Sequence, residues 1–214
     1  MIRIVVADDH TIVREGLKQL LGAAGDLTVV GEAQNGHETL ERVRGLEFDL
    51  LLLDMSMPGK SGIELIRQVR AEKPKLRILV LSMHEEHQYA VRAIRAGAAG
   101  YLTKESASRQ LVEAIRKVAS GGAFISAEIA QQLALGAMPD AKGPLHAALS
   151  DREFQVFQLI ADGKSASDIA ERLNLSVKTV STHKSNILQK MNMTTTAELI
   201  RYAINQRLVD DGPA

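Results

Sequence analysis

Residues 50–54 read Leu50-Leu51-Leu52-Leu53-Asp54, an apolar run that ends in a carboxylate. A run without polar alternation predicts a strand buried on both faces, because a half-buried strand alternates apolar and polar residues. Strands of this kind occur in parallel sheets that helices cover on both sides. This one segment therefore favours an α/β fold.

The chain on either side of this run alternates between strand-like and helix-like segments. The helix-length segments carry apolar residues three and four positions apart, as at Ile63, Ile66 and Val69. Ser61 and Glu64 have the spacing of a capping box at the start of that helix. The expected strands are residues 2–7, 28–33, 50–54, 77–82 and 100–103. Their alternation with five helices predicts a five-stranded parallel sheet covered on both faces.

The composition excludes several classes of protein. The 214 residues include 26 basic and 26 acidic side chains, so the net charge is zero, which argues against a non-specific nucleic-acid coat. The absence of cysteine excludes disulfide scaffolds, thiol nucleophiles and cysteine-ligated metal centres. Aromatic residues make up only 3%, which disfavours binders that stack single-stranded bases. No apolar run approaches the roughly 20 residues that span a bilayer, and no signal-peptide pattern is present, so we expect a cytoplasmic protein without a membrane partner.

The pattern changes after residue 121. Glycine and proline recur between residues 121 and 148, around one short expected helix at 126–135, which indicates a linker. From Ser150 onward the pattern is helical only, with capping boxes that begin at Ser150 and Thr195. We therefore expect three parts: residues 1–121, a linker at 122–147, and a small all-α domain of four helices at 148–214.

Polar side chains follow the expected strands at their carboxyl ends. Asp8 and Asp9 end the first strand, Asp54 the third and Ser82 the fourth, and Lys104 follows the fifth. Ligands of open parallel α/β sheets bind beyond this edge of the sheet, so these side chains are expected to converge on one crevice.

Three carboxylates in one crevice repel each other unless a cation joins them. Oxygen ligands select a hard cation, and Mg²⁺ is the usual one when phosphate is the other partner. A carboxylate can attack phosphorus to form an aspartyl phosphate, while the lysine and the hydroxyl bind the anion. The pattern thus indicates phosphoryl transfer onto an aspartate. A metal-dependent phosphatase is an alternative. Such enzymes have an Asp-x-Asp pattern at the first strand, whereas this chain has adjacent Asp8 and Asp9.

Residues 1–120 resemble the receiver domain of two-component response regulators. The resemblance rests on motifs that span the domain: Val-Ala-Asp-Asp-His at 6–10, Leu-Leu-Leu-Asp-Met-Ser-Met-Pro-Gly at 51–59, Leu-Ser-Met-His at 81–84 and Ala-Gly-Ala-Ala-Gly-Tyr-Leu-Thr-Lys at 96–104. It implies a flavodoxin-like, doubly wound fold. It also implies that Asp54 accepts the phosphoryl group.

The resemblance further implies how the site binds its metal. Asp9 and Asp54 bind Mg²⁺ together with the main-chain carbonyl of Ser56, and Asp8 binds it through water. His10 and His84 lie beside this oxygen-ligand site in the sequence. A role as metal ligands is one interpretation, but we favour the interpretation that both are bystanders.

Three more residues take roles from the resemblance. Lys104 pairs with the phosphate, Ser82 bonds to it and moves, and Tyr101 moves with Ser82 as the switch aromatic. Lys104 is followed by Glu105 where many receivers have proline, so the sequence leaves open whether this peptide bond is cis.

The second half of the chain contains a helix-turn-helix pattern. A short amphipathic segment is followed by Asn174, which tolerates a left-handed turn, and by Ser176, which can cap the next helix. Residues 172–197 contain no acid, and the polar face of this helix carries short hydroxyls, an amide and a lysine, which suit a major groove. That face is Lys178, Ser181, Thr182, Ser185 and Gln189. We expect the residues on its flank to reach the DNA backbone: Thr179, His183, Asn186 and Lys190. Lys184 falls in the apolar stripe, where we expect its stem to pack and its ammonium to reach solvent.

Residues 149–204 are similar to the LuxR-type DNA-binding module. The matching text is Leu-Ser-Asp-Arg-Glu at 149–153, Leu-Ile-Ala-Asp-Gly-Lys-Ser at 159–165, Asp-Ile-Ala-Glu-Arg-Leu at 168–173 and Ser-Val-Lys-Thr-Val-Ser-Thr-His-Lys-Ser-Asn-Ile at 176–187. The similarity implies that the helix at 177–191 enters the major groove and that the helix at 196–204 forms a dimer contact. Base-reading positions of the family often carry lysine or arginine. This chain has Ser181, Thr182 and Ser185 at these positions, so the DNA sequence that it recognises should differ.

The two resemblances together predict a response regulator of the NarL/FixJ class, which is a transcription regulator rather than an enzyme. Its expected partners are a sensor histidine kinase as phosphodonor, double-stranded DNA and a second copy of the chain. Two alternatives stay open: a metal-dependent phosphohydrolase, and a phospho-switch with a protein- or RNA-binding output. Multiple turnover of small phosphate esters favours the first, and a strong preference for a particular duplex DNA excludes the second.

Overall fold

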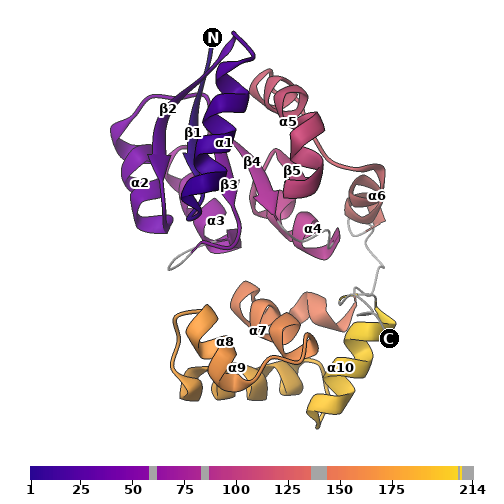
Figure 1. The fold of residues 1–214 in the computed structure, drawn as a ribbon. Helices are drawn as coiled ribbons and strands as arrows, with labels where there is room; N and C mark the ends of the chain where they lie inside the picture. Colours follow the sequence, from indigo (N-terminus) through magenta and orange to yellow (C-terminus); the bar gives the residue numbers. More distant parts are fainter. Residues whose placement is uncertain (58–61, 83–86, 136–143, 207, 209–214) are drawn as a thin grey trace. The chain divides into compact units, whose positions relative to one another are not determined.

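A computed structural model of the chain describes residues 1–57, 62–82, 87–135, 144–206 and 208. The chain divides into two compact units, residues 1–135 and 136–214 (Figure 1). Within the described residues, no helix combines the length and the apolar character that crossing a membrane requires.

The first unit is built on a five-stranded parallel sheet with the strand order β2-β1-β3-β4-β5. The expected strands and helices are confirmed, and only the start of the second strand differs, by one residue. The strands are β1 (Ile2–Ala7), β2 (Leu27–Ala33), β3 (Leu50–Asp54), β4 (Arg77–Ser82) and β5 (Gly100–Thr103). The helices between and after them are α1 (Thr11–Gly22), α2 (Gly36–Gly45), α3 (Gly62–Glu72), α4 (His87–Ala96) and α5 (Lys104–Ala119).

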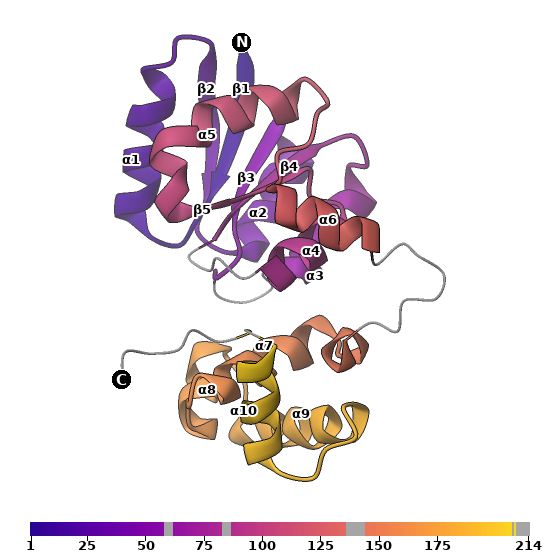
Figure 2. The same cartoon turned by 90° about the vertical axis from the view of Figure 1, so that its right-hand side faces the viewer.

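The apolar run of β3 lies at the centre of the sheet and serves both faces. Leu51 and Leu53 belong to a core with side chains of α2, α3 and α4, whereas Leu50 and Leu52 belong to a core with α1 and α5. All four leucines are fully buried. The two views of the ribbon show these helix layers on opposite faces of the sheet (Figures 1 and 2). A strand between two helix layers needs apolar side chains on both sides, which explains the unbroken run.

The segment after α5 corrects one expectation. Residues 122–147 were expected to form a linker with a short helix at 126–135. The helix is present as α6 (Ala127–Leu135), but it packs on the first unit, where Ile129 is buried in the core with α4. Phe124 forms a bridge with Gly100, and the amide of Tyr101 donates to the Phe124 carbonyl at 2.9 Å. The segment is therefore anchored along β5 before it reaches α6. The rest of the expected linker includes residues 136–143, which lie outside the described residues, as does Ser61 of the expected capping box.

The second unit is all-helical, as expected. It contains a 3₁₀ turn η1 (Leu145–Ala148) and four helices, α7 (Asp151–Ala161), α8 (Ala166–Arg172), α9 (Val177–Lys190) and α10 (Thr196–Asn205). The expected capping boxes at Ser150 and Thr195 are both formed. Helix α7 packs against α9 and α10, and its Phe154 and Phe157 are fully buried. The ring of Tyr202 on α10 contacts this cluster.

Candidate phosphoryl-acceptor site and nucleic-acid interface

The carboxylates predicted to converge do meet at one edge of the sheet. Strands β1 and β3 are parallel neighbours, with Ala7 paired to Leu53, so the residues that follow them lie side by side. Asp8 and Asp54 are each 1% exposed, and the side chain of Asp9 is 30% exposed. Carboxylates as deeply buried as Asp8 and Asp54 are costly unless charged or hydrogen-bonding partners compensate them.

Lys104 supplies part of that compensation. It is the first residue of α5, directly after β5, and its side chain is 13% exposed. Its ammonium lies 2.7 Å from Asp8 Oδ2 and 3.1 Å from Asp54 Oδ2, so it bridges the ends of β1 and β3. The structure contains no cis peptide bond among its described residues, so the Lys104–Glu105 bond is trans.

The electrostatic environment shifts the pKa of both partners. Burial raises the pKa of the Asp54 carboxyl, and the charge of Asp8 raises it further, while Lys104 acts in the opposite direction. Burial works against the charged form of Lys104, but its hydrogen bond to Asp8 and the charge of Asp54 raise its pKa above the ordinary value. The lysine therefore stays charged, and Asp54 gains from any further cation.

The remaining receiver residues lie around the same edge. Ser82 is 1% exposed at the end of β4 and is paired with Thr103 of β5. Tyr101 is 6% exposed in β5 and belongs to the core on the α4 side of the sheet. The main-chain amide of Ser56 donates to Asp54 Oδ1 at 3.3 Å, so the turn after β3 orients the Asp54 carboxylate.

Arg14 is a positioning residue of this site that sequence reasoning missed. It is 4% exposed on α1, and its Nη1 donates to the main-chain oxygen of Asp8 at 2.8 Å. Its Nη2 donates to Thr11 and its Nε to Glu32 of β2. The sequence contains one indication of this role, because Arg14 lies three residues before Leu17 and therefore on the buried side of α1. By fixing the turn after β1, Arg14 holds the backbone that carries Asp8.

His10 is the second residue whose place the sequence did not predict. Interpreted from the sequence as a bystander, it has its Nδ1 2.9 Å from Asp9 Oδ1 and 3.2 Å from Asp8 Oδ1. One ligand atom from each of Asp8, Asp9, His10 and Asp54 lies within 4.8 Å of all the others. His84 lies outside the described residues.

The donor set fits a divalent cation. Asp9 Oδ1 and Asp54 Oδ2 are buried carboxylate oxygens. Among the described residues, they lie in ion-pair contact with His10 and Lys104 but accept no well-aligned hydrogen bond. Three carboxylates face the single ammonium of Lys104, so negative charge is left over at this edge. Hard oxygen donors with unbalanced charge are the ligands that Mg²⁺ prefers.

The second candidate surface begins at the turn between α8 and α9. Asn174 has φ +52°, the left-handed conformation expected at this turn. The Ser176 side chain accepts the amide of Thr179 and caps α9, as predicted. A second left-handed asparagine, Asn192 at φ +53°, follows α9 and was not anticipated. The recognition helix thus has a fixed start and a fixed end.

The polar face expected on α9 is exposed. Its hydroxyls donate to main-chain oxygens one turn back, at 3.0 to 3.1 Å, so their lone pairs point outward as acceptors. The exposed residues of this face are Lys178, Ser181, Thr182, Ser185 and Gln189. On the flank, Asn186 is exposed, whereas Thr179 and His183 are half-buried.

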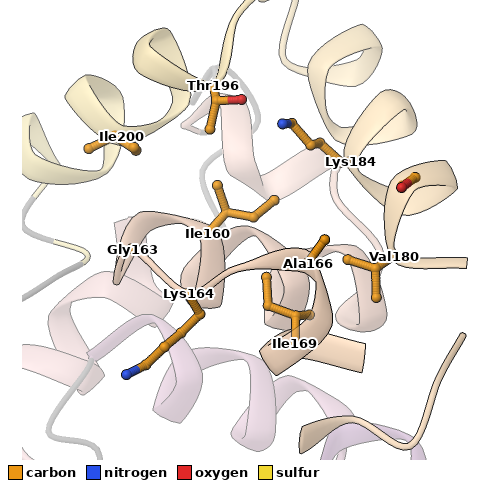
Figure 3. Close-up of a pocket in the computed structure, with 10 residues that line it drawn as sticks. Ile160, Gly163, Lys164, Ala166, Ile169, Val180, Lys184, Thr196 and Ile200 are labelled. Atoms are coloured by element: carbon orange, nitrogen blue, oxygen red, sulfur yellow. The ribbon is translucent and has the colours of Figure 1, made fainter. Parts of the chain in front are cut away.

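Two lysines of α9 occupy more specific positions. Lys190 pairs with Glu153 of α7, whose carboxylate is 2.7 Å away and 5% exposed, so this lysine contributes to packing inside the unit. Lys184 is half-buried and lines a cavity of about 280 Å³ with apolar walls that include Ile160 and Val180. Its side chain runs along this cavity, with its nitrogen turned toward Thr196 of α10 (Figure 3). Lys178 is the exposed basic residue of the polar face.

Comparisons with known proteins match both halves of the chain. Residues 4–116 match the family model described as a response regulator receiver domain. Residues 147–203 match the model of bacterial regulatory proteins of the luxR family.

Curated relatives cover the chain from end to end. The response regulator GacA of Pseudomonas aeruginosa is 38% identical over 211 residues, which are 98% of this chain and 99% of that protein. The response regulator UvrY of Escherichia coli K12 is 38% identical over 209 residues, which are 97% of this chain and 96% of that protein.

Solved structures agree with this assignment. The RcsB response regulator of Salmonella typhimurium superposes with a TM-score of 0.69 at 28% identity, over 95% of this chain and 97% of that one. An RcsB–DNA complex gives a TM-score of 0.59 at 27% identity, over 95% of this chain and 98% of that one. The chain therefore belongs to the two-component response regulators of the NarL/FixJ class, and it is a transcription regulator under phosphorylation control whose receiver domain is followed by a LuxR-type DNA-binding domain.

Proposed function

We propose that Asp54 is the phosphoryl acceptor and that a phosphohistidine of a sensor kinase is the donor. The observation that carries this proposal is the bridge of Lys104 between Asp8 and Asp54, two carboxylates that are each 1% exposed. A buried carboxylate at the end of a central strand, beside an ammonium, has the position and the charge environment that a nucleophile toward phosphorus requires.

The transfer step exchanges a P–N bond for a P–O bond. One carboxylate oxygen of Asp54 forms a bond to phosphorus while the bond to the donor imidazole breaks. The departing imidazole keeps the electron pair of that bond and takes up a proton. Asp9, Asp54 and the main-chain carbonyl of Ser56 would hold Mg²⁺, with Asp8 reaching it through water. The cation would neutralise charge on the phosphoryl oxygens.

Residues around Asp54 then respond to the negative charge of the phosphoryl group. The Lys104 ammonium exchanges a carboxylate oxygen for a phosphoryl oxygen, and the Ser82 hydroxyl donates to another. Ser82 and Tyr101 lie on adjacent strands that pair along their length, so a shift of the β4 end repacks Tyr101 against α4. The surface formed by α4 and β5 is thus the output face of the switch.

The output is sequence-specific binding of duplex DNA by α9. Outward-facing hydroxyl oxygens accept hydrogen bonds from the exocyclic amines of cytosine and adenine, and the methyl group of Thr182 suits the methyl group of thymine. One exposed lysine on this face makes the affinity of one copy modest, so two copies joined through α10 bind together. Residues 1–121 carry the switch and residues 148–214 carry the DNA reader. The protein works in the cytoplasm and turns over no substrate beyond its own aspartyl phosphate.

Duplex selection from a random pool tests this output. Full-length protein is loaded with Mg²⁺ and beryllofluoride, a stable phosphoryl mimic, and the selected duplex is titrated by fluorescence anisotropy. Loading should tighten binding of the wild type at least about tenfold and leave Asp54→Asn unchanged. Equal binding by loaded and unloaded wild type contradicts control by Asp54. Absence of any enriched duplex contradicts the DNA output and leaves a protein- or RNA-binding output.

A further inference from the structure

The ring of His10 lies beside the carboxylates of Asp8 and Asp9. It is the N-cap residue of α1, and its side chain makes no capping hydrogen bond. Its amide donates to Asp8 Oδ1 at 2.8 Å, and its carbonyl accepts the amide of Arg14 at 3.1 Å. These two bonds fix its backbone. Its ring Nδ1 lies at hydrogen-bond distance from Asp8 Oδ1, and the side chain is 63% exposed, so a metal ion would take the place of the Nδ1 proton.

The distances around the ring fit the edge of a coordination octahedron. At metal–ligand distances of about 2.1 Å, adjacent ligands of an octahedral ion lie about 3.0 Å apart and opposite ligands about 4.2 Å apart. His10 Nδ1 lies 2.9 Å from Asp9 Oδ1 and 3.2 Å from Asp8 Oδ1. The ring nitrogen is therefore placed as a ligand adjacent to the Asp9 carboxylate.

An imidazole nitrogen changes which ion such a site prefers. Carboxylate and carbonyl oxygens suit Mg²⁺, whereas imidazole suits first-row transition metals, whose affinities rise from Mn²⁺ through Co²⁺ to Ni²⁺. A site made only of carboxylates already binds the later metals of this series more tightly. A nitrogen ligand strengthens the binding of transition metals further, but it does not strengthen the binding of Mg²⁺.

We propose that His10 is a fourth protein ligand that makes the acceptor site a mixed nitrogen–oxygen site for a divalent transition metal such as Co²⁺. The inference rests on the proposed function, because it uses the same direct ligands, Asp9, Asp54 and the main-chain carbonyl of Ser56. It adds that a transition metal competes with Mg²⁺ for the receiver, so the ion that occupies the site depends on which metals are present.

Calorimetric titration of the full-length protein with Mg²⁺ and with Co²⁺ tests the selectivity. Removing His10 should lower the Co²⁺ affinity by about tenfold or more and the Mg²⁺ affinity by less than about threefold. His10→Ala and His10→Asn should both show this loss, and asparagine is itself a good N-cap, which protects the fold of α1. His37→Ala is the matched control, because His37 is 83% exposed on α2 and faces only Glu41 among the described residues.

Electron paramagnetic resonance of the Mn²⁺-loaded protein tests the bond itself. A directly bound imidazole gives a nitrogen hyperfine coupling that changes when histidine is labelled with ¹⁵N. The wild type and His37→Ala should show this coupling, and His10→Ala should lack it.

The outcomes separate this inference from the proposed function. If the Co²⁺-to-Mg²⁺ affinity ratio is the same in wild type and His10→Ala, or if the wild type lacks the nitrogen coupling, His10 is not a ligand. In that case Asp54→Asn still weakens Mg²⁺ binding and the proposed function stands. If Asp54→Asn leaves Mg²⁺ binding unchanged, the acceptor site itself is wrongly placed.

Discussion

The ammonium of Lys104 lies 3.1 Å from the carboxylate of Asp54, and the two side chains are 13% and 1% exposed. A charged pair this far from solvent interacts strongly, and either partner left alone would be a poorly compensated buried charge. The same ammonium is 2.7 Å from Asp8, so one cation serves two carboxylates. This shared cation explains how the site stays folded before any phosphoryl group arrives.

Replacing Lys104 by methionine should therefore destabilise the first unit in the absence of metal. The expected cost is about 3 kcal/mol, because Asp8 and Asp54 lose their common partner. Mg²⁺ should raise the melting temperature more in this variant than in the wild type, since the added cation replaces the lost charge. Thermal unfolding with and without Mg²⁺ measures both effects. Arg116→Met, which breaks an ion pair with Asp26 whose side chains are both about half exposed, should change stability far less. A variant as stable as the wild type in chelator argues against the bridge.

The Glu153–Lys190 pair predicts a pH dependence in the second unit. Burial raises the pKa of Glu153, but the hydrogen bonds from Lys190 and from the Ser150 amide and hydroxyl outweigh it, so the pKa lies below its ordinary value of 4.5. A carboxyl with a lowered pKa stabilises the fold above pH 4.5, and that stabilisation is lost as the pH falls through the lowered value.

Glu153→Gln should cost about 1–2 kcal/mol at pH 7 and progressively less below about pH 4.5. Hydrogen exchange of α7 and α9 peptides in the full-length protein, compared between variant and wild type at each pH, measures this difference. Glu171→Gln, an exposed glutamate on α8, provides the control for a change of charge alone. A difference between Glu153→Gln and wild type that is independent of pH would rule out the ion pair as its cause.

Two of the three lysines of α9, Lys178 and Lys190, should separate DNA binding from stability. Lys178 is exposed on the polar face, so Lys178→Ala should weaken binding of every duplex alike and reduce the slope of log affinity against log salt by about one. Lys190 is paired with Glu153, so Lys190→Ala should lower stability and leave the salt slope nearly unchanged. Anisotropy titrations at several salt concentrations, together with urea unfolding, measure both. The reverse assignment of the two effects would mean that Lys190 leaves Glu153 to contact phosphate.

The turn between α8 and α9 depends on a residue that tolerates positive φ. Asn174→Ala should cost about 1 kcal/mol because alanine at φ +52° brings its Cβ against the following carbonyl. Asn174→Gly should be close to neutral, since glycine adopts this conformation without a steric penalty. Pulse proteolysis in urea gives the two stabilities, and equal losses for both variants would assign the effect to the lost amide rather than to backbone geometry.

Local patterns predicted most of this fold because the determining interactions are local. The leucine run of β3, the capping boxes at Ser150 and Thr195, and the left-handed Asn174 all depend on neighbouring residues. The carboxylates were found because the end of each strand is itself a local feature, and parallel pairing brings these ends together.

The features that sequence reasoning missed depend on pairings between distant residues. Phe124 bridges to Gly100, which attaches the segment expected as a linker to β5. Lys190 was expected to reach DNA, but it pairs with Glu153, 37 positions away. Arg14 reaches Glu32 on the neighbouring strand as well as the Asp8 backbone, and only the packing of α1 against the sheet reveals that role.

Intact mass after incubation with Mg²⁺ and acetyl phosphate tests the central claim most directly. The wild type should gain one phosphoryl group, and the gain should require Mg²⁺. Asp49→Asn, which changes the carboxylate just before the opposite end of β3, should gain it too, and Asp54→Asn should not. An equal gain by Asp54→Asn would contradict the account, as would a wild type that neither gains mass nor binds beryllofluoride in the presence of Mg²⁺.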